Sequence, residues 1–145
     1  MLEHGVEGDL ERGRVATDLS QQQSPFNGGE GPTGGIGFEV ARALADEGAD
    51  VIISGRNTER GEEAAQALGA KARFVLADLT DLDAVRALAE AAGDVDVDVL
   101  VNNAAAFIGG PAVEQDVESF EESFAANVRG PCFPTAVLVP KMFAK

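Results

Sequence analysis

The sequence contains few of the residues on which metal and redox sites depend. Its 145 residues include one cysteine, one histidine, no tyrosine and no tryptophan. A single cysteine excludes an intramolecular disulfide and a four-cysteine zinc site, and a single histidine excludes sites that need several. A catalytic triad built on His4 is excluded because this residue lies in a stretch without hydrophobic pattern. Cys132 has no evident basic partner, so we interpret it as a small packing residue rather than a nucleophile.

Positive charge is scarce as well. The chain has 11 Lys and Arg against 25 Asp and Glu, a net charge of −14. Such a chain repels nucleic acid and anionic membranes, so we expect neither as a partner. The sequence has no run of about 18 apolar residues and no apolar signal core near Met1. We therefore expect a cytoplasmic protein without a metal.

The chain changes its pattern near residue 35. Residues 1–34 are rich in glycine, carry two prolines and the run Gln21–Gln23, and have Val6 and Val15 as their only β-branched aliphatic residues. This composition predicts turns and coil. We expect an irregular segment over residues 1–29 and a single domain over residues 30–145.

Helical and strand patterns alternate after residue 35. Helices are predicted from Ile36 to Gly48, from Asn57 or Thr58 to Leu68, from Thr80 or Asp81 to Gly93, and over 117–143; strands are predicted at 51–55, 74–77 and 97–101. Apolar strands that alternate with helices are typical of a parallel sheet with helices on both faces. The fold class is therefore predicted to be α/β, with right-handed crossovers.

A glycine cluster opens directly into the first predicted helix. It reads Gly31-Pro32-Thr33-Gly34-Gly35-Ile36-Gly37. Glycines let the backbone approach a pyrophosphate, and a helix N-terminus offers free N–H groups to it. The alternative interpretation is a glycine-rich coil that merely precedes a helix. The G-x-G-x-x-G fingerprint does not fit because Phe38, Glu39 and Val40 follow Gly37.

The spacing Gly31-x-x-x-Gly35-x-Gly37 resembles the first loop of the short-chain dehydrogenase/reductase family. Further elements follow in the family's order: Ser54-Gly55-Arg56-Asn57, Ala77-Asp78-Leu79, Val101-Asn102-Asn103-Ala104-Ala105 and Asn127-Val128-Arg129-Gly130. The first three of these come at predicted strand ends, and the fourth falls in the last predicted helix. The resemblance covers about residues 30–145 and implies a partial, NAD(P)-binding, Rossmann-like domain.

The resemblance also implies roles for individual residues. The implied cofactor contacts are Gly31, Thr33, Gly35, Ile36, Gly37, Arg56, Asp78, Leu79, Asn102, Asn103 and Ala104. In the family the residues matching Asp78 and Leu79 border the adenine, and the one matching Asn127 holds a water of the catalytic proton relay. Purely structural alternatives are a helix-capping carboxylate for Asp78 and a polar residue at a helix kink for Asn127.

Arg56 bears on the choice of cofactor. NAD-binding sheets place an Asp or Glu after the second strand for the ribose 2′-hydroxyl, and no acid occurs between Val51 and Thr58. A guanidinium there suits a 2′-phosphate, which favours NADP(H) over NAD(H). The alternative is a solvated loop arginine.

The sequence departs from the family pattern at two places. The family's catalytic Ser and Tyr-x-x-x-Lys lie beyond the asparagine helix, and this chain has no tyrosine. At the place of the family's first strand, this sequence reads Ser24-Pro25-Phe26-Asn27-Gly28-Gly29-Glu30. Its proline and glycines argue against a central strand there. Either residues 12–17 supply a poor strand, or the sheet closes differently, or the reading frame is damaged; Pro134 inside a helix favours the last option.

The sequence thus leads to one main functional hypothesis and two alternatives. The chain is interpreted as the cofactor-binding part of an NADP(H)-dependent oxidoreductase that acts on a small carbonyl or alcohol and is inactive as this fragment. The alternatives are a non-catalytic nucleotide-binding or dimerisation module, which would form a homo-oligomer through the helix at 117–143, and a truncated product without function.

Overall fold

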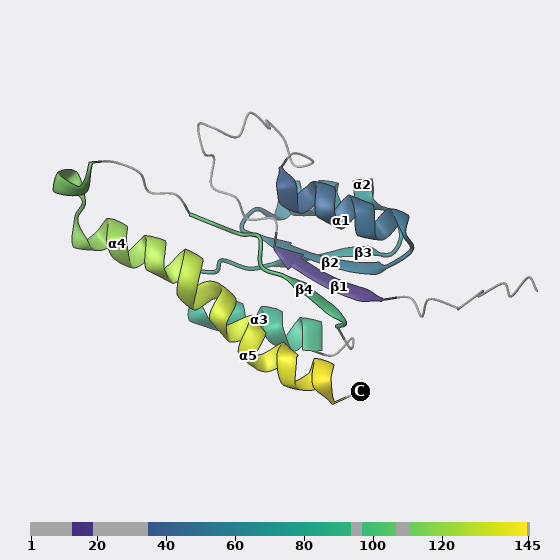
Figure 1. Cartoon of the computed structure of the whole chain (residues 1–145). Coiled ribbons are helices and arrows are strands. Elements are labelled where there is room, and N and C mark those ends of the chain that lie inside the picture. Colours follow the sequence, from purple (N-terminus) through teal and green to yellow (C-terminus); the bar gives the residue numbers. More distant parts are fainter. Residues whose placement is uncertain (1–12, 19–34, 94–96, 107–110, 145) are drawn as a thin grey trace, which may run out of the picture.

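A parallel sheet with helices on both faces forms the centre of the protein (Figure 1). The structure, a computed structural model, describes residues 13–18, 35–93, 97–106 and 111–144. Its elements are β1 (Arg14–Asp18), α1 (Ile36–Asp46), β2 (Asp50–Gly55), α2 (Thr58–Leu68), β3 (Ala72–Leu76), α3 (Leu82–Gly93), β4 (Val99–Val101), a 3-10 turn (Ala112–Glu114), α4 (Val117–Phe124), a π turn (Ala125–Arg129) and α5 (Gly130–Phe143). The described strands have the order β3-β2-β1-β4, and the predicted α/β class is confirmed.

The central strand of the sheet is β1, which lies inside the segment predicted to be irregular. Val15 is in register with Val51 of β2 on one side and with Val99 of β4 on the other. The Arg14 carbonyl accepts the Asp98 N–H at 2.8 Å, and the Arg14 N–H donates to the Asp98 carboxylate at 2.8 Å. The prediction of coil over residues 1–34 is therefore wrong for residues 14–18. Of the alternatives considered, a short strand over residues 12–17 is the one that the structure supports, with observed bounds of Arg14–Asp18.

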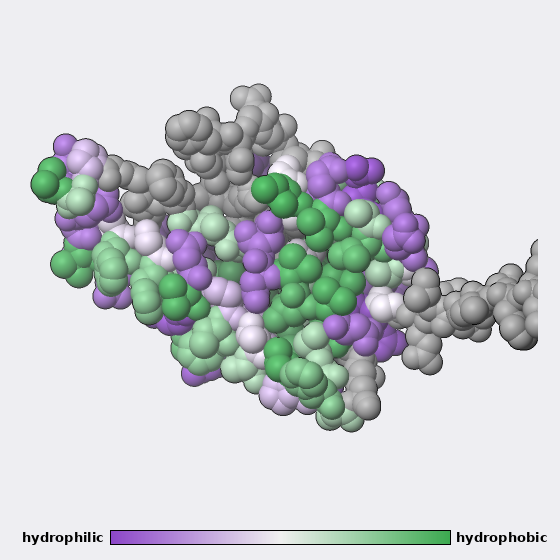
Figure 2. Space-filling model, in the orientation of Figure 1, coloured by the Kyte–Doolittle hydropathy of each residue, from purple (hydrophilic) through white to green (hydrophobic). Residues whose placement is uncertain are grey.

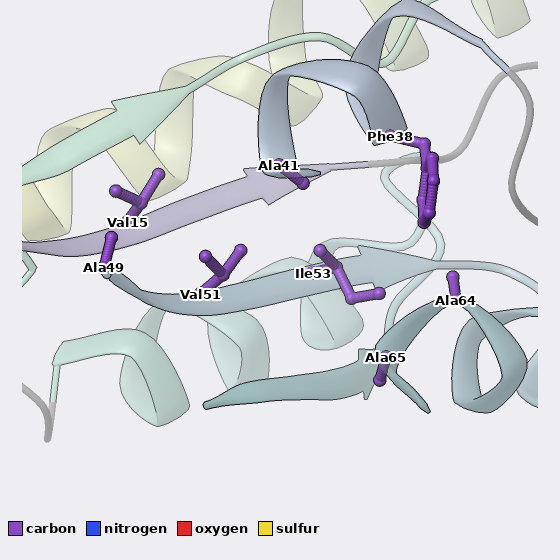
Figure 3. Packing of buried hydrophobic residues seen from close by; sticks show 8 residues of the cluster. All are labelled: Val15, Phe38, Ala41, Ala49, Val51, Ile53, Ala64 and Ala65. Carbon is purple, nitrogen blue, oxygen red and sulfur yellow. The ribbon is translucent and has the colours of Figure 1, made fainter. Parts of the chain in front are cut away.

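The two faces of the sheet are covered by different helices. Val15, Val51 and Ile53 point to one face, where they form a cluster with Phe38 and Ala41 of α1, Ala64 and Ala65 of α2, and Ala49, which precedes β2 (Figure 3). Ala16 and Ile52 alternate with them and pack against α3 and α5 on the other face. This alternation follows from the two-residue period of a strand. Both faces of the central strands are buried, which explains their apolar runs.

The helix ends follow the capping residues that the sequence indicated. The Asn57 side chain accepts the Arg60 N–H at 2.9 Å, and Gly69 follows the helix with a positive φ of 102°. A positive φ is strained for residues with a Cβ, so Gly69 ends α2 without cost. At α3, Asp81 accepts the Asp83 and Ala84 N–H groups. The predicted bounds of both helices are confirmed within one or two residues.

The predicted helix over 117–143 is observed as α4, the π turn and α5 in direct succession. Pro134 and Pro140 lie inside α5, so a proline is accommodated there. The apolar residues that predicted this helix share a face that the protein leaves open, because Val117, Phe120, Phe124 and Val128 are 70%, 62%, 48% and 49% exposed. No helix among the described residues has the length and apolar character needed to cross a membrane.

One edge of the sheet also carries apolar surface. In Figure 2, apolar surface gathers over the middle of the molecule, between α1 and α5, where β4 forms the end of the described sheet. Val99 of β4 is 43% exposed there. The short β4 therefore has a strand neighbour on one side only within the described part of the chain.

Candidate functional site

Loops that follow strands β2, β3 and β4 surround one depression, which we call the strand-end hollow. It is lined by Arg56 after β2, by Asp78–Thr80 after β3, by Ala104–Ala106 after β4, and by Ala126 of the π turn. Its volume is about 300 Å³ with its solvent-open part included. Since the carboxyl ends of parallel strands meet at one edge of a sheet, ligands of open α/β sheets bind in such a place. Four of the predicted contacts, Arg56, Asp78, Leu79 and Ala104, therefore come together.

Asp78 shapes the loop on which it lies. Its Oδ1 accepts the Thr80 N–H at 2.9 Å and the Thr80 hydroxyl at 2.8 Å. Asp81, not Asp78, caps α3, so the capping alternative for Asp78 is wrong. Leu79 is buried at 8% exposure among Val85 and Leu88 of α3, with Ala104 packed against the same cluster. The loop after β3 is thereby joined to the loop after β4.

Asn127 binds the backbone of the opposite loop with both ends of its amide. Its Oδ1 accepts the Ala106 N–H at 2.8 Å, and its Nδ2 donates to the Ala106 carbonyl at 2.8 Å. These bonds fix the end of the Ala104–Ala106 wall to the π turn. A role of Asn127 in a proton relay stays a prediction.

The predicted contacts Asn102 and Asn103 do not line the strand-end hollow. The Asn102 Nδ2 donates to the Thr135 hydroxyl of α5 at 3.3 Å, and Asn102 lines a second cavity between the sheet and helices α3 and α5. Asn103 is half-buried and does not line the strand-end hollow. Their roles in cofactor binding remain predictions.

The glycine cluster is described only in its second half. Gly31 and Thr33 lie outside the described residues, whereas Gly35 precedes α1 with a φ of 104°. The Gly35 carbonyl accepts the Glu39 N–H at 3.2 Å, so the helix begins where the sequence predicts. Gly37 is buried and Ile36 is 67% exposed. The N-terminus of α1 thus follows directly on the glycine at which a phosphate was predicted.

Arg56 supplies positive charge to the strand-end hollow. Arg42 and Arg86 form ion pairs with carboxylates of their own helices, whereas Arg56 forms no ion pair with another described residue. Within the described part of the chain, no three His, Cys, Asp or Glu residues are grouped as metal ligands. The chemistry that this arrangement supports is the binding of an anionic ligand with an apolar portion.

The sequence did not indicate that Ala126 of the π turn lines this site. Ala126 lines the strand-end hollow, and Ala105 and Ala106 extend its wall. An alanine inside a helix carries no signal of its own, because it is equally frequent on buried faces without function. Only its position beside Asn127 could have drawn attention to Ala126.

Comparisons with known proteins agree with this geometry. The profile of the family described as short chain dehydrogenase matches residues 30–145. Galactitol 2-dehydrogenase of Agrobacterium fabrum is 38% identical over 117 residues, which cover 79% of this chain and 46% of that relative. A solved short chain dehydrogenase/reductase family protein is 45% identical with a TM-score of 0.77, over 92% of this chain and 51% of the other.

A further solved structure carries both a cofactor and a substrate. L-sorbose reductase from Gluconobacter frateurii, complexed with NADPH and L-sorbose, is 27% identical with a TM-score of 0.76, over 92% of this chain and 49% of the other. The chain spans about half the length of the relatives it matches. With the strand order, the strand-end loops and the matched profile in agreement, the chain belongs to the short-chain dehydrogenase/reductase family of oxidoreductases.

Proposed function

We propose that residues 30–145 are the cofactor-binding part of an NADP(H)-dependent oxidoreductase that acts on a small carbonyl or alcohol. The observation that carries this proposal is the gathering of Arg56, Asp78, Leu79 and Ala104 around the strand-end hollow. In this proposal the adenine lies against the apolar wall of Leu79 and Ala104. The pyrophosphate lies at the N-terminus of α1, where free N–H groups and the helix dipole favour negative charge.

The preference for NADP(H) rests on Arg56. A guanidinium binds a phosphate through two parallel hydrogen bonds, whereas it gains little from a ribose hydroxyl. In a chain of net charge −14, a local cation is needed to hold an additional phosphate. The exposed Arg56 side chain lies after β2, beside the start of α2, and supplies that cation.

The proposal separates cofactor binding from catalysis. The 145 residues include no tyrosine, the residue that the family uses for proton exchange with substrate. The nicotinamide supplies hydride chemistry when it is bound, and Asn127 is the residue of this chain that the family pattern assigns to the proton relay. We therefore propose that the isolated chain binds NADPH without reducing a carbonyl.

The test compares NADPH with NADH on the full 145-residue chain by isothermal titration calorimetry. Removing one charge-assisted contact in Arg56→Ala should weaken NADPH binding by about 10- to 100-fold and leave NADH nearly unchanged. Arg86→Ala is the matched control, because it removes an exposed arginine that is paired only with Asp83 on α3. An equal loss for both cofactors would contradict the role of Arg56, and a chain that binds neither would contradict the proposal as a whole.

A second candidate function, self-association, is favoured by the open face of α4. Phe120 and Phe124 stack there with ring centroids 6.1 Å apart and stand on an exposed apolar face. Such faces on soluble proteins mark contact surfaces. Sedimentation of the wild-type chain should reveal a dimer that Phe120→Glu converts to a monomer. Leu76→Glu, which places the same charge at the exposed last residue of β3, should remain dimeric.

A further inference from the structure

We infer that Arg129 and Gly130 are positioning residues that hold the Asp78–Thr80 loop in the shape that an adenosine needs; this inference rests on the proposed function. Both residues lie where the π turn passes into α5. Neither lines the strand-end hollow, so each acts through the loop that does.

The Arg129 side chain binds the backbone of the Asp78–Thr80 loop. The Arg129 guanidinium donates to the Thr80 carbonyl at 2.9 Å, a contact that joins residues 49 positions apart. On its other side the Thr80 N–H is bound by the Asp78 carboxylate. The peptide groups of Thr80 are therefore held from both directions, by its own loop and by the π turn.

Gly130 allows the helix to come this close. A Cβ at this position would lie 2.8 Å from the Leu79 Cβ and 3.0 Å from the Leu79 carbonyl oxygen. Real Cβ atoms essentially never approach another carbon to 2.8 Å, and the Leu79 Cβ cannot move without its backbone, so a larger residue would push α5 away from the loop. Leu79 is the apolar residue proposed to contact the adenine, and Gly130 thereby sets its position.

The π turn holds both walls of the strand-end hollow at once. Asn127 is bound to Ala106 on one wall, Arg129 is bound to Thr80 on the other, and Ala126 is part of the lining. Three residues within one helical turn therefore fix the width of the hollow. Because this width is already fixed in the free protein, less conformational entropy is lost when a ligand binds, and the affinity for the ligand is higher.

The test uses 2′,5′-ADP, which contains the adenosine and the 2′-phosphate, and the full chain. Arg129→Met removes the donor and keeps the apolar stem, so we expect binding to weaken by about threefold to tenfold in calorimetry. Arg129→Lys, which restores a donor, should recover most of this affinity. Arg86→Met is the control for the lost positive charge. Gly130→Ala should weaken binding to a similar degree.

Amide hydrogen exchange supplies a readout that does not depend on the ligand. The Asp81 N–H donates to the Asp78 carbonyl, and it should exchange faster in Arg129→Met than in the wild type or in Arg129→Lys. Binding by Arg129→Met within about twofold of Arg86→Met would overturn this inference and leave the proposed function intact. A wild-type chain that does not bind 2′,5′-ADP would overturn both.

Discussion

Replacing Thr17 with valine is expected to stabilise the protein. Thr17 lies on β1 at 3% exposure, and its hydroxyl has no hydrogen-bond partner among the described residues. A buried hydroxyl without a partner costs about 1–3 kcal/mol relative to an apolar group of the same shape. Since valine keeps the shape and removes the hydroxyl, Thr17→Val should raise the free energy of unfolding by about 1–2 kcal/mol. For a chain of this size the melting temperature should then rise by about 3–8 °C.

Urea unfolding followed by far-UV circular dichroism measures this change, because the chain has no tryptophan or tyrosine for fluorescence. Thr17→Ser keeps the hydroxyl and loses a buried methyl, so it should lower stability by about 1 kcal/mol. Val15→Thr places a second hydroxyl on the same strand at 2% exposure and should lower stability by about 1–3 kcal/mol. A Thr17→Val variant with an unchanged m-value and no gain in stability would refute the reasoning.

Two further predictions concern glycine and pH. A Cβ at Gly61 would overlap the Phe74 ring, so Gly61→Ala should cost about 1–3 kcal/mol, whereas Gly93→Ala meets only the flexible end of Lys141 and should change thermal stability little. The pKa of Asp116 lies below its ordinary 3.8 because its carboxylate, at the N-cap of α4, accepts hydrogen bonds from a serine side chain and backbone. The unfolded chain therefore binds this proton first, so the stability that Asp116 contributes is present above about pH 4 and is lost as pH falls through its folded pKa. The urea midpoints of wild type and Asp116→Asn should differ by a constant amount above about pH 4, and this difference should change only below that pH. A difference in midpoint that stays constant down to about pH 2 would contradict the lowered pKa.

Local chemistry decided which elements the sequence predicted well. The bounds of α2 follow from Asn57 and Gly69, whose effects act within a few residues of the helix ends. In contrast, β1 has the single large aliphatic Val15 and is flanked by sequence typical of coil. Its hydrogen bonds come from β2 and β4, which are distant along the chain. A strand that is specified by its neighbours carries little signal of its own.

The same distinction applies to the strand-end hollow. Arg56, Asp78, Leu79 and Ala104 were predicted as cofactor contacts from the family resemblance, and they come together because the ends of parallel strands meet at one edge of the sheet. The contacts of Asn127 with Ala106 and of Arg129 with Thr80 were not predicted, since they join residues 21 and 49 positions apart through side-chain geometry. The helical period of Phe120 and Phe124 predicted a helix correctly, yet a period cannot say whether an apolar face meets a core or solvent.

The open edge at β4 has a consequence for how the protein behaves in solution. The strand Val99–Val101 contains no lysine, proline or bulge, the features by which edge strands resist pairing with other chains. What keeps two molecules apart is their net charge of −14, and this repulsion extends only about 8 Å at physiological ionic strength. We therefore expect added salt to promote pairing between the β4 edges of different molecules, beyond any contact made through α4.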